Sequence, residues 1–439
     1  MTQLQSNNNL INQSLIQLQS NLDNILKPQS PPIKSNKCIL QIVASFSMLL
    51  SKQNQQQIKN QQKAQQMQVK TPKILSFVSS KLQLQQMYQP VIFEYEEIAN
   101  RDNVLHDKIK QAYGPEGVGL CIVKNVPKYT EYRSNLLPLG HQLANLPQEK
   151  LDKLTRPELF YSSGWSHGKE QFRGRVDTSK GSFYGFPLND TPIVQLDENL
   201  AEKGGVIQRN IWPTEDIPAF EQSFKDLGRL MSEVGALLAY HIDKYVKSVI
   251  PNYEMGQMEG IIKNGNQHVG RFLHYFASDE QKLIEDDWCG WHNDFSVLTG
   301  LAASMYTNKN GEVVEDFYDP EGGLFVKSRN SEKVRVKIPK DCLAFQSGEV
   351  AQIVSGGLIV ATPHCIVRGP KSIGTGIARN NFVNFLSPNQ SFEMRVPEGV
   401  DPNTVANMEC YYVTKLKDRW NQGMNYGEFS LNSLKAIRY

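Results

Sequence analysis

Three side chains that can bind a metal ion lie in two short apolar segments of this chain. His292 and Asp294 are two positions apart in WHNDF, and His364 follows later in ATPHCIV. Residues two apart in a strand point to the same side, so this imidazole and this carboxylate would lie next to each other. Two histidines and one carboxylate leave coordination positions open, which suits Fe(II) that must also bind a co-substrate and oxygen. Zinc accepts the same ligands and is the chemical alternative.

A histidine and an aspartate at this spacing also occur by chance, as a hydrogen-bonded histidine beside a surface carboxylate. The surrounding sequence weakens that interpretation, because the apolar stretch FSVLTGL follows the pair directly. A carboxylate that is buried in such a setting is costly unless it binds a cation. We therefore interpret His292, Asp294 and His364 as a candidate metal triad.

A second chemical feature is Arg379, in the strand-like segment GIARNNFVNFLSP. An arginine that is buried among apolar residues needs an anion, either a small-molecule carboxylate or an internal ion-pair partner. Tyr275 in RFLHYFA is a candidate hydroxyl donor to the same anion, and an ordinary half-buried strand aromatic is the simpler interpretation. The residues alone leave these alternatives open.

The elements that would position these residues are short and follow Pro251. The strand-like segments are RFLHYFA, CGWHNDFSVLTGLAASMY, GLFVKS, KVRVKIP, CLAFQSG, VAQIVSG, ATPHCIV and IARNNFVNFLS. Gly, Asn or Pro turns separate them, and no long helical pattern interrupts them. A series of short strands of this kind predicts a β-sandwich, a barrel or a jelly roll.

Helical periodicity is strongest over residues 217–250, where apolar residues recur three and four positions apart. We expect one long helix there, with one face packed on a large surface. The Gly-rich stretch 164–185 is predicted to be a long surface loop or a hairpin, and residues 402–420 are predicted to be helical.

Residues 1–89 differ in composition from the rest of the 439-residue chain. They are rich in Gln, Asn, Ser and Lys, so they cannot bury enough apolar surface to offset chain entropy, and we expect a disordered tail. An apolar run at 38–50 is too short to span a membrane. It leaves targeting open, and we expect a cytoplasmic protein. The net charge of +2 disfavours a nucleic-acid binder. The six cysteines form no CxxC pair, which disfavours a disulfide-stapled secreted scaffold.

Taken in order, segments between about 90 and 388 resemble the isopenicillin N synthase-like family of non-haem Fe(II), 2-oxoglutarate-dependent dioxygenases. RFLHYFA is similar to the family's Arg-x-x-x-Tyr strand, WHNDFSVLTGL to its His-x-Asp-Phe segment, and PEGGLFVK to its Gly-Leu-hydrophobic strand. CLAFQSGEVAQIVSGG is similar to the stretch before the last ligand, and TPHCIV and IARNNFVNFLSP are similar to the distal histidine and Arg-x-Ser segments. Several ordered segments at compatible spacing are more specific than any one motif.

The resemblance implies an α+β fold with a mainly β core, namely a double-stranded β-helix (jelly roll) with flanking helices and one long buttressing helix. It divides the chain into the tail at 1–89, an N-terminal helical and strand region at 90–255, the dioxygenase core at 256–390 and a C-terminal helical extension at 391–439.

The resemblance also implies a reaction and its residues. His292, Asp294 and His364 would be the iron ligands, and Arg379 would bind the distal carboxylate of 2-oxoglutarate with help from Tyr275. The implied enzyme uses Fe(II), 2-oxoglutarate and O2 to hydroxylate or desaturate a small molecule, with release of succinate and CO2. The sequence does not identify the substrate or the oligomeric state.

The sequence departs from the family pattern near the proposed anion site. Asn381 replaces the serine two residues after Arg379, and its amide can still donate to a carboxylate, so we retain it as a co-substrate residue. Some relatives use the same arginine for a substrate carboxylate, which makes an iron oxidase without 2-oxoglutarate the alternative function. A catalytically silent jelly-roll binding protein is a third interpretation.

Overall fold

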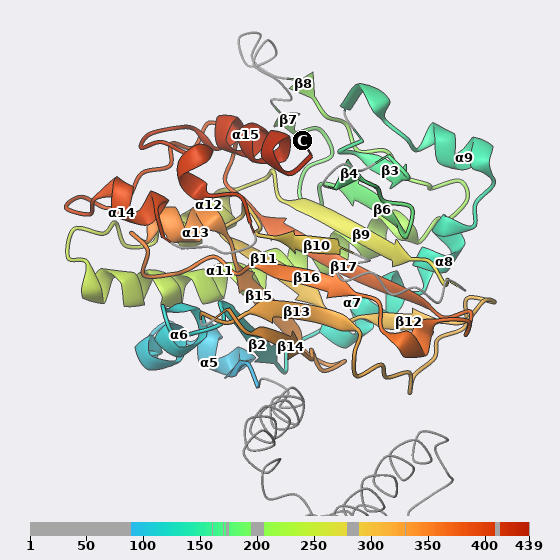
Figure 1. Ribbon diagram of the computed structural model, residues 1–439, viewed down its shortest axis with the longest axis horizontal. Coiled ribbons are helices and arrows are strands. Elements are labelled where there is room, and N and C mark those ends of the chain that lie inside the picture. Colours follow the sequence, from blue (N-terminus) through green and yellow to red (C-terminus); the bar gives the residue numbers. More distant parts are fainter. Residues whose placement is uncertain are drawn as a thin grey trace, which may run out of the picture. The chain divides into compact units, whose positions relative to one another are not determined.

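The computed structural model describes residues 89–159, 161–169, 171–172, 175–194, 206–278, 289–329, 331–408 and 413–438 (Figure 1). All of them belong to the unit that spans Met87–Tyr439. The predicted tail at 1–89, apart from its last residue, lies outside the described residues, as does the apolar run at 38–50. Of the helices in the described ranges, none is both long and apolar enough to cross a membrane.

The larger of two facing sheets has nine strands. Along its main path the order is β1–β2–β15–β11–β17–β9–β6–β3, and β12 pairs with β17. The strands are β1 (Val91–Glu94), β2 (Leu120–Lys124), β3 (Gly164–His167), β6 (Lys180–Gly185), β9 (Val269–Tyr275), β11 (Leu298–Ala302), β12 (Met305–Thr307), β15 (Leu343–Ser347) and β17 (Ala378–Leu386). Strands β1 and β2 pair in parallel, whereas β17 pairs antiparallel with both β9 and β11.

The smaller sheet has four strands in the order β10–β16–β13–β14. They are β10 (Cys289–His292), β13 (Gly323–Lys327), β14 (Lys333–Val336) and β16 (His364–Val367). Apolar side chains from both sheets meet in one buried cluster, to which the larger sheet contributes Leu273, Leu301 and Val383 and the smaller sheet Leu324, Val326 and Val336. Two mainly antiparallel layers around a shared core form the expected jelly roll.

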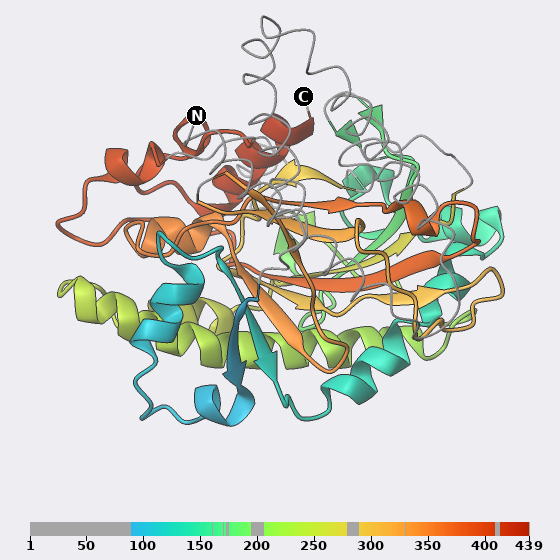
Figure 2. The same cartoon turned by 60° about the horizontal axis from the view of Figure 1, so that its bottom comes forward.

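The predicted long helix is present as α11 (Phe220–Val249) and covers the outer face of the larger sheet (Figure 2). The Phe224 ring packs edge-on against Phe382 of β17, with ring centroids 4.8 Å apart. Gly235 allows the helix to approach this strand closely, because a Cβ there would lie 2.2 Å from a methyl carbon of Leu386. The helix therefore fixes the back of the strand that carries Arg379.

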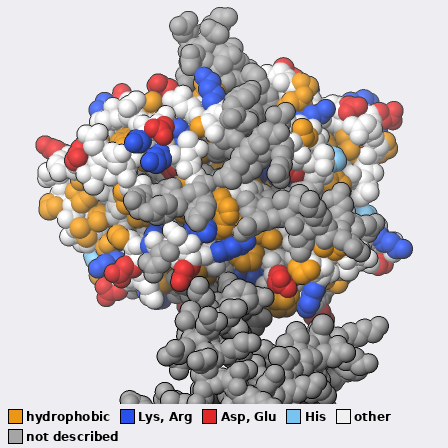
Figure 3. All heavy atoms as spheres, viewed as in Figure 1, with side chains coloured by type: hydrophobic (Ala, Val, Ile, Leu, Met, Phe, Trp, Pro, Cys, Tyr) orange, Lys and Arg blue, Asp and Glu red, His pale blue; other side chains and the backbone are white. Residues whose placement is uncertain are grey.

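The remaining elements surround this core. The helices are α5 (Tyr95–Ala99), α6 (His106–Tyr113), α7 (Tyr129–Leu136), α8 (Leu139–Ala144), α9 (Gln148–Lys153), α12 (Gln257–Asn264), α13 (Glu349–Val354), α14 (Pro402–Ala406) and α15 (Tyr426–Arg438), with 3-10 turns η1 (Pro157–Leu159), η2 (Pro370–Ser372) and η3 (Leu416–Asp418). Two short strand pairs are β4 (Gln171–Phe172) with β5 (Arg175–Val176) and β7 (Ile193–Val194) with β8 (Val206–Ile207). On the face seen in Figure 3, basic and acidic side chains are interspersed over the described surface.

Three segments that the sequence assigned to a loop or hairpin, a strand and a helix lie among these elements. The stretch 164–185 contains an antiparallel pair, in which β6 joins β3 to the larger sheet through β9. The expected strand VAQIVSG is wrong, because Glu349–Val354 forms helix α13. The expected helix at 402–420 is also largely wrong, since α14 ends at Ala406 and a longer helix, α15, begins only at Tyr426.

Candidate metal centre

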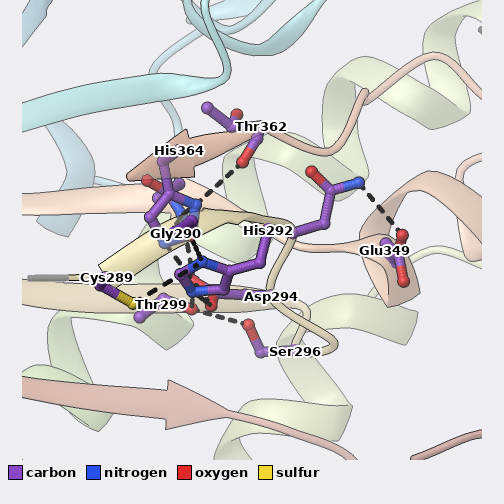
Figure 4. A network of polar contacts seen from close by, with 11 residues as sticks. Cys289, Gly290, His292, Asp294, Ser296, Thr299, Glu349, Thr362 and His364 are labelled. Atoms are coloured by element: carbon purple, nitrogen blue, oxygen red, sulfur yellow. Dashed lines mark hydrogen bonds and ion pairs between the residues drawn. The ribbon is translucent and has the colours of Figure 1, made fainter. Parts of the chain in front are cut away.

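The two histidines of the candidate triad lie opposite each other on neighbouring strands. His292 is the last residue of β10, His364 is the first residue of β16, and the two are register partners in the antiparallel ladder. Asp294 follows in the turn after β10, so the strand alternation expected for His292 and Asp294 is wrong. The turn nevertheless brings the carboxylate back to the histidines (Figure 4).

The potential ligand atoms converge on one small volume. The Nε2 atoms of His292 and His364 each lie 3.8 Å from Asp294 Oδ1. One ligand atom from each residue can be chosen so that all three lie within 4.8 Å of one another. The 3.8 Å separations are too long for hydrogen bonds. A cation bound at about 2.1 Å from each atom would bridge this spacing after a small side-chain adjustment.

Hydrogen bonds orient both imidazoles toward this point. His292 Nδ1 lies 2.7 Å from the carbonyl oxygen of Gly290, and His364 Nδ1 lies 3.0 Å from that of Thr362. Carbonyl oxygens only accept hydrogen bonds, so the Gly290 contact favours the proton on Nδ1 of His292 and leaves its Nε2 lone pair for a metal. His364 Nδ1 also lies 2.8 Å from Gln346 Nε2, so this ring is held from two sides with Nε2 toward Asp294. The neutral imidazole with a bare Nε2 is the form that coordinates.

The carboxylate of Asp294 is oriented in the same way. Its Oδ2 accepts hydrogen bonds from Thr299 Oγ1 at 2.7 Å and from Gln346 Nε2 at 3.0 Å. Oδ1 is thereby left facing the two histidines. Asp294 is only 5% exposed, and a buried carboxylate of this kind requires a compensating cation. The donor set, its burial and its orientation therefore fit a divalent metal ion.

The two histidines differ in their affinity for protons. Burial and the neighbouring His292 lower the pKa of His364 to about 4, which keeps its imidazole neutral. Burial also lowers the pKa of His292, but the negative charges of the adjacent Cys289 thiolate and of Asp294 raise it to a net value of about 9. A bound cation would replace the proton that His292 carries, so metal binding would release a proton.

Arg379 and Tyr275 lie side by side on the larger sheet, across a shared cavity from the candidate triad. They are register partners in β17 and β9, and the guanidinium carbon lies 4.8 Å from the centroid of the tyrosine ring. Both side chains are buried. Burial raises the pKa of Tyr275 to about 12 although Arg379 works against this shift, so the phenol stays protonated and able to donate.

One cavity between the two sheets is lined by all six residues that the sequence singled out. They are His292, Asp294, His364, Tyr275, Arg379 and Asn381. Asn381 already uses its amide within the protein, since Nδ2 donates to Ala302 O at 2.7 Å and to Ser304 Oγ at 3.3 Å. His274 faces the other side of β9, as strand alternation predicts, and contacts Asn380 Oδ1 through Nδ1 at 2.7 Å.

Sequence reasoning missed the residues that support the triad. Thr299 and Gln346 are polar residues in buried strands, and nothing in the order of the chain connects them to Asp294. Gln346 lies opposite Thr299 in the β15–β11 ladder, and this pairing brings both to the carboxylate. A buried glutamine within the apolar run CLAFQSG was the one available signal, because buried amides require partners.

No family model and no curated protein matches the sequence. Solved structures do resemble the fold. A putative 2OG-Fe(II) oxygenase family protein from Caulobacter crescentus aligns with a TM-score of 0.57 at 18% identity, covering 79% of this chain and 99% of that chain. A full-length Neurospora crassa protein, solved in complex with alpha-KG, aligns with a TM-score of 0.56 at 17% identity, covering 80% and 100%. The same Neurospora protein in complex with alpha-KG and thymine gives 0.53 at 19% identity, covering 79% and 96%. At these identities the likeness establishes the jelly-roll fold.

Proposed function

We propose that this protein is a non-haem Fe(II), 2-oxoglutarate-dependent dioxygenase of the isopenicillin N synthase-like type, acting on a small molecule. The main support is that His292 Nε2, His364 Nε2 and Asp294 Oδ1 converge in a cavity that Arg379 also lines. Two imidazoles and one carboxylate on a jelly roll leave room for a chelating co-substrate and oxygen. The likeness to the Neurospora crassa structures, whose ligands include alpha-KG, supports this choice of co-substrate.

In this proposal each residue of the cavity has a defined task. His292, Asp294 and His364 hold Fe(II), while Thr299 and Gln346 fix the carboxylate. Fe(II) held by these residues, with 2-oxoglutarate and O2, would supply the oxidising power for hydroxylation or desaturation of a C–H site, with release of succinate and CO2. The protein contributes ligand geometry, orientation of the co-substrate and a cavity with apolar walls that limits access of water.

Arg379 would bind the distal carboxylate of 2-oxoglutarate. A guanidinium offers two parallel donors to a carboxylate, and at this burial depth the pair would be strongly charge-assisted. Tyr275, beside it and protonated, would donate a further hydrogen bond. Asn381 lies on the same face of β17 and would reach the co-substrate only by exchanging one of its present acceptors, Ala302 O or Ser304 Oγ.

Anaerobic titration of the full-length protein with Fe(II), followed by 2-oxoglutarate, tests this proposal. We expect stoichiometric Fe(II) binding and then a visible metal-to-ligand charge-transfer band on addition of 2-oxoglutarate. Iron binding without the band, combined with substrate-dependent O2 uptake and no succinate, would select the oxidase alternative. Absence of Fe(II) binding would overturn the metal centre and leave a jelly-roll binding protein.

A further inference from the structure

A buried ion pair joins helix α13, which contacts the turn that carries Asn293 and Asp294, to the C-terminal part of the chain. Arg419, directly after η3, donates from Nη2 to Glu349 Oε1 at 2.6 Å and from Nη1 to Glu349 Oε2 at 2.8 Å. The two side chains are 4% and 3% exposed. Glu349 is the first residue of α13, so this bidentate pair connects two segments that are 70 positions apart in the sequence.

Glu349 also holds the turn that carries Asn293 and Asp294. Its backbone N–H donates to the carbonyl oxygen of Asp294 at 2.9 Å. Its Oε1 accepts a hydrogen bond from Asn293 Nδ2 at 3.1 Å, and Glu349 is labelled at the edge of the network in Figure 4. Asn293 stands between two of the proposed ligands, His292 and Asp294. One glutamate thus contacts both residues of the turn that follow the strand.

Arg419 is in turn fixed by the C-terminal segment. Its Nη1 donates to Ser433 Oγ of α15 at 2.6 Å, and its Nη2 donates to the Thr414 carbonyl oxygen at 3.0 Å. The guanidinium carbon lies 5.8 Å from the ring centroid of Phe295, the residue after Asp294, and 5.6 Å from that of Phe429 in α15. The position of the arginine therefore depends on how 413–438 packs.

These contacts help to hold Asp294, the one residue of the triad that strand pairing does not fix. Asp294 lies beyond the end of β10, so the strand ladder that fixes His292 opposite His364 does not fix the carboxylate. Buried ion pairs add little net stability compared with apolar side chains of similar volume, so stability alone does not explain this one. Second-sphere contacts of metal ligands commonly change metal affinity by roughly 10–100-fold.

We infer that Glu349 and Arg419 are positioning residues, through which the C-terminal segment sets the affinity of the triad for its metal. The inference rests on the proposed metal centre, but it holds for any divalent cation that this centre binds. It assigns the region 413–438 a role in metal loading, in addition to its packing role.

Binding of Co(II) by the full-length protein under anaerobic conditions tests this inference, with the Kd and the visible Co(II) absorption spectrum as readouts. The main variant is E349L/R419M, which removes both charges and leaves neither unpaired in the interior. We expect it to fold, to bind Co(II) severalfold more weakly, and to show an altered spectrum, because the turn loses its side-chain link between Asn293 and Glu349. The control is E259Q, which removes the negative charge from the more exposed bidentate Arg101–Glu259 pair away from the site and should leave both readouts unchanged.

Wild-type Co(II) affinity and spectrum in the folded double variant would overturn the inference while the metal centre stands. If the double variant does not fold, N293A decides, because it removes only the side-chain link between the turn and Glu349. It should weaken Co(II) binding severalfold, and unchanged binding would overturn the inference. Failure of the wild-type protein to bind Co(II) or Fe(II) would instead refute the proposed metal centre, and the inference with it.

Discussion

His292 and His364 face each other across the β10–β16 ladder, with ring centroids 4.2 Å apart. A single antiparallel pair therefore supplies both imidazoles, and their relative position follows from backbone hydrogen bonds. The carboxylate comes from the turn that follows, where other contacts must hold it. This division determines which substitutions should abolish metal binding and which should only weaken it.

Removing a ligand should abolish binding. We expect His292→Ala and Asp294→Ala each to lose stoichiometric Fe(II), because the two remaining protein ligands would hold the ion too weakly to survive desalting. Metal analysis after anaerobic loading and desalting measures this. His167→Ala, at an exposed histidine of β3, is the control and should retain the metal. Full iron occupancy in both ligand variants would refute the triad.

Loss of a supporting hydrogen bond should have a smaller effect. Thr299→Val keeps the shape of the side chain but removes the hydroxyl that donates to Asp294 Oδ2. We expect the Kd for Fe(II) or Co(II) to rise roughly 10–100-fold, with the fold retained. Thr307→Val, at a buried threonine that accepts from Asn380, is the matched control. An unchanged Kd in the Thr299 variant would mean that Asp294 is held adequately without it.

Removal of the proposed anion partner should raise the requirement for 2-oxoglutarate. In Arg379→Met the distal carboxylate would be buried without a counterion, which costs about 2–5 kcal/mol, or roughly 30-fold or more in apparent Kd. Titration of the charge-transfer band with 2-oxoglutarate measures this change. Arg335→Met, at another cation that lines the cavity, is the control. If the two variants need the same co-substrate concentration as the wild type, Arg379 binds something else.

The buried His274 should make the fold sensitive to acid. Burial lowers its pKa to about 4, whereas an unfolded histidine titrates near 6.5. The unfolded state therefore binds the proton first, and the stability contributed by neutral His274 is lost as the pH falls from about 6.5 to 4. The full effect is roughly 3 kcal/mol. His274→Gln should show a flatter pH dependence of unfolding in that window, and parallel profiles for the two proteins would contradict the assignment.

Much of the candidate site could be predicted from the sequence, because its residue types rarely occur together in apolar segments. Two histidines, an aspartate and an arginine are conspicuous in apolar segments. The helical periodicity of α11 extends over 30 residues, so it identifies the helix unambiguously. The helix α13 was missed because its six residues, EVAQIV, include two valines and an isoleucine, which read equally well as a short buried strand. Asp294 was assigned to a strand because nothing in WHNDF marks where β10 ends.

The contacts around the ligands could not be derived in this way. Gln346, Glu349 and Arg419 reach the turn only through the pairing of β15 with β11 and the packing of the C-terminal segment. Such contacts link distant positions and leave no local pattern. At 402–420 the start at Pro402 follows a recognisable cap, as Asp401 accepts from Asn403, but the helix ends within two turns.

The proposed metal ligands belong to one sheet and its adjoining turn, whereas Arg379 belongs to the other sheet. A dicarboxylate chelated at the metal and anchored at Arg379 would span the gap between the two layers. The apolar side chains that meet between those layers, such as Leu301 and Leu324, determine how wide the gap is. Leu301 and Leu324 also line the cavity, so the packing of the core would set the distance between the metal and Arg379, and with it the length of dicarboxylate that can bridge them.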